Sequence, residues 1–158
     1  MTDERSTEFV LRRATIEDAE CLFNWRNDPE TRKHSKNNGI INWDEHLAWL
    51  LKSVGNYARG RMLYIAETID GRPVGTVRAD ICKDDSYEIS YTVAPEFRGK
   101  GVAKRMVVQF VREIIPQKSL VAHIQKGHAS SEGVAKALGL HPVSENPLQD
   151  GVVMTEWR

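Results

Sequence analysis

The sequence predicts an α/β domain built around one mixed β-sheet, and three observations support this fold class. Short apolar runs alternate with amphipathic segments of helical period along the chain of 158 residues. Hydrophobic residues make up 41% of the chain and charged residues 28%, which is ordinary for a globular protein of this size. A glycine-rich turn at residues 99–101 leads from an apolar strand directly into a helix. We expect residues 1–158 to form a single domain.

The first third of the chain predicts one strand and two helices. Phe9-Val10-Leu11 is short and apolar, as in a strand. Thr15, with Asp18 three residues later, predicts a helix N-terminus, and that helix should end just before Pro29. A second capping pattern begins at Asn42. The apolar face of the second helix is expected to consist of Trp43, Leu47, Leu50 and Leu51.

The remainder predicts the other strands and two further helices. Asp70-Gly71 is a strong hairpin turn between the apolar runs 63–66 and 73–77. Further strands are predicted at 87–93 and 120–124, and a closing pair at 141–143 and 152–154. An amphipathic helix is predicted from Val102 to Ile115, where Pro116 terminates it, and a short one from Ser130 to Leu138.

Charge and composition exclude several classes of partner. The 22 basic and 22 acidic residues give a net charge of zero and are spread evenly, so we expect no nucleic-acid partner. No apolar run approaches the roughly 18 residues of a membrane span, and none near Met1 resembles a signal peptide. Cys21 and Cys82 are far apart and read as free thiols of a reducing compartment. We expect a cytoplasmic protein without a membrane partner.

The histidines do not predict a metal site. No two of them have a convincing metal-ligand spacing with a carboxylate or a cysteine, so we expect no bound metal. His123 lies in an apolar strand and is expected to be a hydrogen-bonded core residue.

The most informative stretch is the glycine-rich turn before the third predicted long helix. Its glycines allow the backbone to approach a ligand, and the free N–H groups at a helix N-terminus form an anion site. The basic residues around the turn, opposed by Glu96 alone, are Arg98, Lys100, Lys104 and Arg105. These features suit a pyrophosphate.

Two other phosphate-binding patterns fit poorly. A P-loop requires Ser or Thr after its lysine, but Lys100 is followed by Gly101. A dinucleotide-binding fingerprint would require a third glycine where Lys104 stands. A glycine-rich turn with a solvated basic edge remains the simplest alternative.

The segment Arg98 to Ala103 resembles the acetyl-CoA signature of the GNAT superfamily: Arg or Gln, two residues, Gly, one residue, Gly or Ala. The preceding residues 88–95 are similar to that family's fourth strand and its exit, and the order of elements fits along nearly the whole chain. The resemblance implies the GNAT fold, a mostly antiparallel sheet of six to seven strands flanked by about four helices, with a splay after the fourth strand. It also implies an N-acetyltransferase that uses acetyl-CoA as co-substrate and a primary amine as acceptor, by direct attack in a ternary complex.

The resemblance also implies which residues hold the cofactor. Backbone amides of the signature would bind the pyrophosphate, with Arg98 at the loop entrance, and the backbone of Val93 would pair with the pantetheine arm. Residues 128–140 resemble the family's second cofactor segment. The residues expected to contact the cofactor are Thr92, Val93, Arg98, Gly99, Lys100, Gly101, Val102, Ala103, Lys104, His128 and Ser131.

That second segment departs from the family pattern at two positions. His128 replaces the usual Asn, and Ala135 replaces the usual Tyr, which in many relatives protonates the leaving thiolate. The proton donor is therefore open between Ser131, His128 and solvent.

Glu88 is the predicted general base. It shares one face of the strand 87–93 with Ser90 and Thr92, whereas a strand covered on both sides should be apolar on both. The polar face indicates a cleft in which Glu88 takes a proton from the amine, directly or through water. A salt-bridged glutamate near the strand start is the alternative. A strand N–H near Thr92 or Val93 could bind the oxyanion.

The acceptor is indicated by a finer resemblance in the first 80 residues. Residues 11–15, 25–29, 45–50 and 74–78, with Arg32 and Ser35, are similar to acetyltransferases that modify the 4-amino group of nucleotide-linked amino sugars, as in pseudaminic acid biosynthesis. This branch implies a small-molecule nucleotide-sugar partner. Arginines would bind its phosphates, Trp49 would stack on uracil, and Asn27 and His46 would bind hydroxyls. The residues expected to bind the acceptor are Arg26, Asn27, His46, Trp49, Arg78 and Ser90.

Several alternatives stay open. Ribosomal-protein N-terminal acetyltransferases share parts of the same pattern, so a peptide N-terminus or another small amine could be the acceptor. A non-catalytic acetyl-CoA-binding module is the rival outside the enzymes. The resemblance leaves a homodimer open.

Overall fold

The computed structural model describes residues 8–35 and 39–158 and contains one seven-stranded sheet of order β1-β2-β3-β4-β5-β7-β6. The first four strands pair antiparallel with one another. The strands are β1 (Val10–Arg13), β2 (Arg61–Glu67), β3 (Pro73–Ile81), β4 (Tyr87–Val93), β5 (Leu120–Gln125), β6 (Pro142–Pro147) and β7 (Val153–Trp157). The predicted mixed, mostly antiparallel sheet is confirmed.

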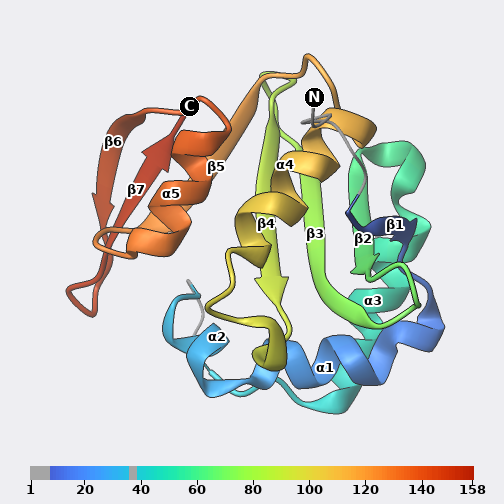
Figure 1. The fold of residues 1–158 in the computed structure, drawn as a ribbon. Helices are drawn as coiled ribbons and strands as arrows, with labels where there is room; N and C mark the ends of the chain where they lie inside the picture. Colours follow the sequence, from blue (N-terminus) through green and yellow to red (C-terminus); the bar gives the residue numbers. More distant parts are fainter. Residues whose placement is uncertain (1–7, 36–38) are drawn as a thin grey trace.

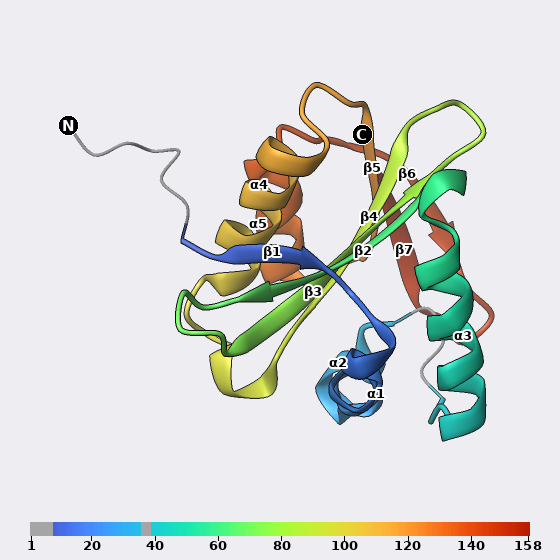
Figure 2. The same ribbon diagram turned by 90° about the vertical axis from the view of Figure 1, so that its right-hand side faces the viewer.

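Helices cover both faces of the sheet. Within the described residues the α-helices are α1 (Ala19–Asn27), α2 (Pro29–Lys33), α3 (Trp43–Gly55), α4 (Val102–Ile114) and α5 (Ala129–Ala137). α4 and α5 lie on one face, and α1, α2 and α3 lie toward the other (Figures 1 and 2). None of these helices combines the length and hydrophobicity that a membrane crossing requires.

The sheet splits between β4 and β5. These strands are parallel and pair at only two positions, Tyr87 with Leu120 and Glu88 with Val121. Beyond them the strands diverge (Figure 1), and β5 pairs with β7 instead. The predicted splay after the fourth strand is thereby confirmed. It leaves an edge of β4 up to Val93 whose backbone groups are not used by β5.

Each face of the sheet has its own hydrophobic core. One core packs the sheet against α4 and α5, with Met106, Val107 and Phe110 fully buried. The other packs it against α1 and α3, around Leu22 and Leu50. The two cores fix the helices on opposite sides of the sheet and thus fix which side chains reach the splay.

The predicted helix starts are confirmed at atomic level. Thr15 and Asp18 form a reciprocal capping box, in which the Asp18 carboxylate accepts from the Thr15 amide at 2.8 Å. Asn42 Oδ1 accepts from the amide of Glu45 at 2.9 Å at the start of α3. α1 ends at Asn27, just before Pro29, as expected.

The predicted apolar face of α3 is wrong at two of its four positions. Trp43 is 41% exposed and Leu51 57%, whereas His46 and Ser53 are buried with Leu50. The buried polar side chains have partners that make burial tolerable: His46 bonds the carbonyl of Ala19, and Ser53 accepts from Arg61. The sequence pattern was interpreted by assuming that polar residues face solvent. Because two polar residues of α3 are buried, this assumption predicts the wrong buried face of the helix.

Gly75 is a position where the fold admits no side chain. A Cβ there would lie 2.6 Å from the Thr92 carbonyl oxygen and 2.8 Å from Met106 Sδ, beneath α4. We predict that Gly75→Ala lowers the free energy of unfolding by roughly 1–3 kcal/mol, because the core must shift to accept the methyl group.

Gly133→Ala is the matched control. Gly133 lies inside α5, with no atom within 4 Å of the added Cβ. This change should raise stability by up to about 1 kcal/mol through helix propensity. Thermal or urea unfolding checks both variants, and equal effects at the two glycines would contradict the packing argument.

Candidate functional site

The predicted anion loop has the backbone geometry that such a site requires. Gly99 and Gly101 have φ of +77° and +70°, in the region that favours glycine. Gly101 is the N-cap of α4, and no side chain caps that helix. The amides of the first turn of α4, from Val102 to Lys104, therefore face outward with the positive end of the helix dipole. This arrangement suits a pyrophosphate.

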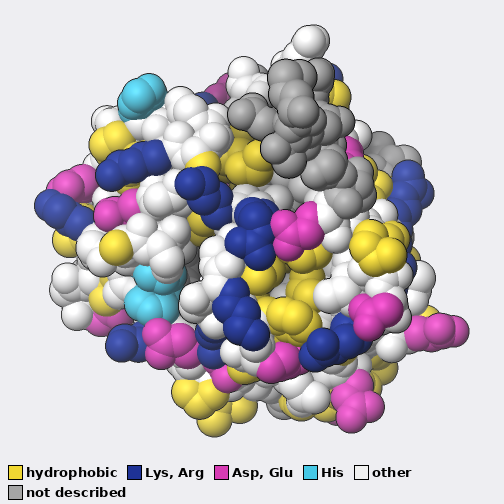
Figure 3. Space-filling model, in the orientation of Figure 1, with side chains coloured by type: hydrophobic (Ala, Val, Ile, Leu, Met, Phe, Trp, Pro, Cys, Tyr) yellow, Lys and Arg dark blue, Asp and Glu magenta, His cyan; other side chains and the backbone are white. Residues whose placement is uncertain are grey.

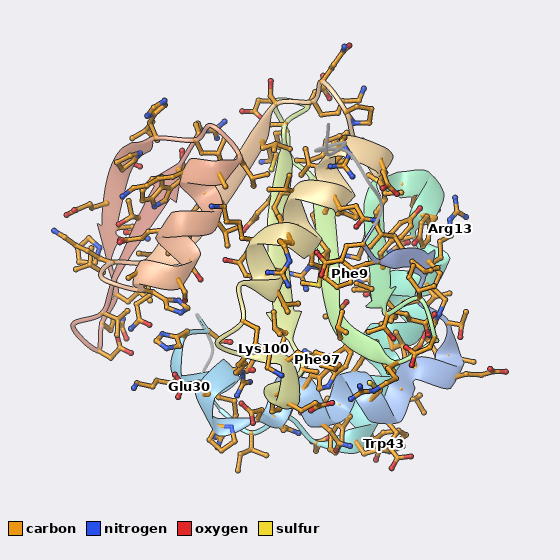
Figure 4. All side chains as sticks on the ribbon, viewed as in Figure 1. Phe9, Arg13, Glu30, Trp43, Phe97 and Lys100 are labelled. Atoms are coloured by element: carbon orange, nitrogen blue, oxygen red, sulfur yellow. The ribbon has the colours of Figure 1, made fainter. Side chains whose placement is uncertain are left out.

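The basic residues of the loop divide into two groups. Lys100 and Lys104 are exposed, whereas Arg105 donates to the Lys100 carbonyl at 2.7 Å and Arg98 turns toward α2. Figure 3 shows Lys and Arg side chains gathered down the face that carries α4, and Figure 4 places Lys100 beside Phe97 at the end of α4 nearest α1 and α2. The loop thus presents two exposed lysines to an anion, whereas its arginines bond other parts of the protein.

Arg98 fastens the loop to the N-terminal helices. Its Nη2 lies 2.6 Å from Asp28 Oδ2 and 3.0 Å from Thr31 Oγ1. Asp28 also caps α2 by accepting from the amides of Glu30 and Thr31. Burial alone would raise the pKa of Asp28, but the hydrogen bonds from Arg98 and from the Thr31 amide outweigh burial and lower it. The predicted residue at the loop entrance is therefore also a link to α2.

His128 stacks on a second histidine across the splay. Its ring lies 3.8 Å, centroid to centroid, from the ring of His34 at the end of α2, with an angle of 9° between the planes. His34 donates from Nδ1 to Gln125 on β5 at 2.9 Å and faces Glu30 with Nε2. Burial and, after it, the proximity of His34 lower the pKa of His128. The pair joins α2 to the start of α5.

Ser131 lies in the first turn of α5, beside the hydroxyl of Tyr91. That hydroxyl is buried and has no hydrogen bond of good geometry, and burial raises the pKa of Tyr91. Ala135 is buried in the core, so no proton donor arises from the position of the family's tyrosine. Tyr91 was missed in the sequence because alternation places it on the face of β4 opposite Glu88.

Glu88 is half-buried on β4, as are Ser90 and Thr92 on the same face. Its Oε2 accepts from His123 Nδ1 at 2.9 Å, and His123 Nε2 lies 3.3 Å from Oε1 of Glu156 on β7. His123 is hydrogen-bonded as predicted, but it is half-exposed rather than part of the core. The sequence offered one signal for this neighbour, a polar residue within an apolar strand.

The expected acceptor residues on α1 and α3 meet around Arg26. The Arg26 guanidinium lies 4.0 Å above the Trp49 ring, and its Nη1 is 2.9 Å from His46 Nδ1. His46 has no exposed surface, and its Nε2 donates to the Ala19 carbonyl at 2.7 Å. Burial lowers the pKa of His46, and the nearby charge of Arg26 lowers it further. The hydrogen bond to the Ala19 carbonyl acts in the opposite direction and raises it. A neutral His46 thus accepts from Arg26 and holds it against Trp49.

Arg26 has a second cation for a neighbour. Burial and the nearby Arg78 lower the pKa of Arg26, and in residues 8–35 and 39–158 no carboxylate lies within ion-pair distance of it. Arg78 Nε lies 3.0 Å from Asp80 Oδ2, but Asp80 also binds Arg61 at 2.6 Å. One carboxylate therefore pairs with Arg61 and Arg78 while Arg26 stays beside Arg78, and the cluster carries uncompensated positive charge.

The two remaining acceptor candidates have structural partners. Ser90 accepts from Arg78 Nη2 at 3.4 Å. Asn27 uses both ends of its amide on the backbone of Ile41, at 2.8 Å each, and so fastens the segment before α3 to α1. In the part of the chain that the structure describes, no group of three or more potential ligands forms a metal site.

Comparison with known proteins gives one family and many similar folds. The sequence model of the acetyltransferase (GNAT) domain matches residues 8–141. A comparison with curated protein sequences found no match. Among solved structures, spermidine N-acetyltransferase from Vibrio cholerae, in complex with CoA and spermine, has a TM-score of 0.80 at 15% identity, covering 96% of this chain and 95% of that one.

Two further structures are similar at slightly higher identity. The protein yncA from Salmonella typhimurium, solved with acetyl-CoA, has a TM-score of 0.74 at 19% identity and covers 96% of this chain and 92% of that one. Ribosomal-protein-alanine N-acetyltransferase from Brucella melitensis has a TM-score of 0.74 at 20% identity, with coverages of 94% and 97%. At these identities the likeness establishes the shared fold.

The stacked histidines predict a pH-dependent contact between α2 and α5. Because the pKa of His128 is lowered in the folded protein, its contribution to stability is present above the ordinary histidine value of about 6.5 and is lost as pH falls below it. We expect protection of the α2 and α5 amides against hydrogen exchange, corrected for intrinsic rates, to fall between about pH 7.5 and 5. His128→Asn should flatten this dependence, and an equally steep one in that variant would contradict it.

Proposed function

The chain belongs to the acetyltransferase (GNAT) family, since that family's model matches residues 8–141, and we propose that it acetylates the 4-amino group of a nucleotide-linked amino sugar. It is an acetyltransferase that uses acetyl-CoA as the acetyl donor. The observation that carries the proposed acceptor is the half-buried Arg26, which faces Arg78 and has no carboxylate partner among the residues that the structure describes.

The cofactor pyrophosphate binds at the N-terminus of α4 in this proposal. The positive φ of Gly99 and Gly101 and the uncapped first turn support it, because they leave outward-facing amides with room for an anion. Lys100 and Lys104 add charge at the rim. The edge of β4 near Thr92 and Val93, which β5 leaves unused, takes the amide groups of the pantetheine arm. When bound, acetyl-CoA supplies the thioester.

The acceptor binds on the face of the sheet opposite α4, where Arg26 and Arg78 lie. Two guanidinium groups in half-buried surroundings bind phosphate oxygens with charge-assisted hydrogen bonds, and the anion relieves their mutual repulsion. The same cluster disfavours polyamines and other polycations. A nucleotide-sugar combines the required anion with a neutral sugar that carries the reacting amine.

His46, Trp49 and Asn27 act behind this surface in the proposal. His46 and Trp49 hold the Arg26 guanidinium from its edge and its face, and Asn27 fixes the segment before α3. They therefore position the acceptor site, whereas Arg26, Arg78 and Ser90 contact the acceptor.

Glu88 and Ser131 carry out the proton transfers. Glu88 takes a proton from the acceptor nitrogen as that nitrogen forms a bond to the thioester carbonyl. A backbone N–H near Thr92 or Val93 stabilises the oxyanion. The Ser131 hydroxyl, next to the buried Tyr91 hydroxyl, donates a proton to the leaving thiolate. A thiol is a good leaving group, so this donor contributes less than the base.

The test of the acceptor is an acetylation panel read by thiol release. It contains a UDP-linked 4-amino-4,6-dideoxy sugar, the same sugar without its nucleotide, kanamycin, spermine and an alanine-terminated peptide. We expect the UDP-sugar to turn over fastest. Rapid acetylation of the peptide with none of the nucleotide-sugar would overturn the proposed acceptor while leaving the family assignment intact.

Arg26→Gln tests the anion contact within the same panel. We expect it to raise the KM for the UDP-sugar at least about tenfold while the affinity for acetyl-CoA stays unchanged. Arg13→Gln is the matched control, because the Arg13 guanidinium also lies 4.0 Å above an aromatic ring, that of Tyr57. Figure 4 places Arg13 on the side of the molecule beyond β1. Equal effects of the two changes would contradict the role of Arg26.

Lys104→Glu tests the cofactor loop without disturbing the fold. An acidic residue in the first turn of a helix is favourable for the helix, but it repels a pyrophosphate at the same N-terminus. We expect acetyl-CoA to bind about tenfold more weakly by calorimetry, or roughly 1.4 kcal/mol, with no loss of thermal stability. Lys118→Glu, an exposed change of the same charge beyond the other end of α4, should leave affinity unaltered.

A further inference from the structure

We propose that Glu88, His123 and Glu156 form a proton relay that holds the general base in place and carries its proton to the solvent edge of β7. The proposal rests on the proposed function only in taking Glu88 as the base. His123 and Glu156 are then positioning and relay residues that act through Glu88.

The hydrogen-bonding pattern of His123 implies a shared proton. Each of its ring nitrogens faces a carboxylate oxygen, Glu88 Oε2 at 2.9 Å and Glu156 Oε1 at 3.3 Å. A neutral imidazole can donate from one nitrogen only, so a bare lone pair would otherwise face an anionic oxygen. Both contacts are favourable when the ring is an imidazolium or when one carboxyl is protonated. A proton can therefore pass along the triad without any side chain moving.

The relay lies on rigid backbone at the vertex of the splay. Glu88 belongs to the last residue pair that joins β4 to β5, and His123 and Glu156 are direct cross-strand partners on β5 and β7. Three adjacent strands thus present the three side chains in one row. Side chains on paired strands keep their spacing better than side chains on loops, which is what repeated proton transfer requires.

The charged side chains around the triad are engaged by other partners, so His123 is the neighbour that bonds Glu88. Asp80, the cross-strand neighbour of Glu88 on β3, is bound by Arg61 and Arg78. At the other end, Glu156 accepts from Arg158 at 2.7 Å, and Arg158 also bonds Asp84 at 2.9 Å. The hydrogen bond from Arg158 lowers the pKa of Glu156, so Glu156 holds a proton briefly.

The far end of the relay opens toward solvent. Glu156 and His123 line a cavity of about 340 Å³ together with Ser144, Asn146, Leu148 and Met154. Glu156 itself is 29% exposed at its side chain. A proton that reaches Glu156 can therefore leave to water.

One turnover restores every protonation state, with water as the final proton acceptor and donor. The N–H bond of the acceptor breaks and its proton adds to Glu88, which passes it to the free lone pair of His123 Nδ1. The ring gives its Nε2 proton to Glu156 Oε1, and Glu156 releases it to water, so Glu88 is again a carboxylate. Between turnovers the ring recovers an Nε2 proton from water through Glu156 and releases its Nδ1 proton to water through Glu88. Ser131 replaces from water the proton that it gave to the thiolate.

The relay is tested with His123→Gln and Glu156→Gln, assayed with the amine of the panel that the unmodified enzyme acetylates fastest. We expect His123→Gln to lower kcat about tenfold or more and Glu156→Gln by a smaller factor, with acetyl-CoA affinity unchanged. Both losses should appear in kcat and not in the KM for the acceptor, because the relay acts on proton transfer and not on acceptor binding. Glu156→Asp should recover part of the rate.

Two controls and one further variant separate the possible failures. His141→Gln and Glu145→Gln change exposed residues of the same types near β6 and should leave kcat and KM unaltered. If His123→Gln and Glu156→Gln match these controls at every pH while Glu88→Gln is slow, the relay is overturned and the base stands. If Glu88→Gln keeps full turnover, the assignment of the base fails, and with it the relay.

Discussion

The short parallel contact between β4 and β5 is the constraint on which the rest of the structure depends. Two residue pairs join the strands, and beyond Glu88 and Val121 they separate. Backbone N–H and C=O groups on a strand edge need hydrogen-bond partners. An unpaired edge inside a folded domain can therefore bind a ligand that carries amide groups. The same separation places the α4 N-terminus and the polar face of β4 at one opening. A sheet paired along its full length would have no opening between β4 and β5, and Glu88 would not lie where these two strands begin to separate.

The strands on either side of the opening are joined by polar contacts and by a shared apolar core. His34 stacks on His128 and bonds Gln125, and His123 bonds Glu88. Such polar contacts contribute modestly because water competes for the same groups. The core beneath α4 and α5 contributes more, because it joins buried residues of β3 and β4 to those of β5 and β7. We therefore expect the two sides of the opening to unfold together.

The net charge of this protein does not predict which charged groups a substrate would meet, because positive and negative side chains gather in different places. At the proposed acceptor site, Arg61 and Arg78 share the carboxylate of Asp80, and Arg26 lies beside Arg78. Carboxylates of Glu88 and Glu156 share one imidazole at the proposed base. A total of zero thus conceals one region of excess positive charge and one region of excess negative charge on neighbouring strands. The two regions suit an acceptor with an anionic end and an amine end.

The sequence by itself determined the features that depend on neighbours in the chain. The capping box at Thr15, the hairpin turn at Gly71 and the glycine loop before α4 are local, because a few adjacent residues set their dihedral angles and hydrogen bonds. Alternation along β4 likewise assigned Glu88 to the polar face. Tertiary structure alone decided that His123, 35 residues away, would meet Glu88, and that His46 would be buried against Arg26. Those contacts depend on how strands and helices pack, and the wrongly predicted face of α3 has the same cause: a polar side chain is buried wherever packing supplies it with a partner.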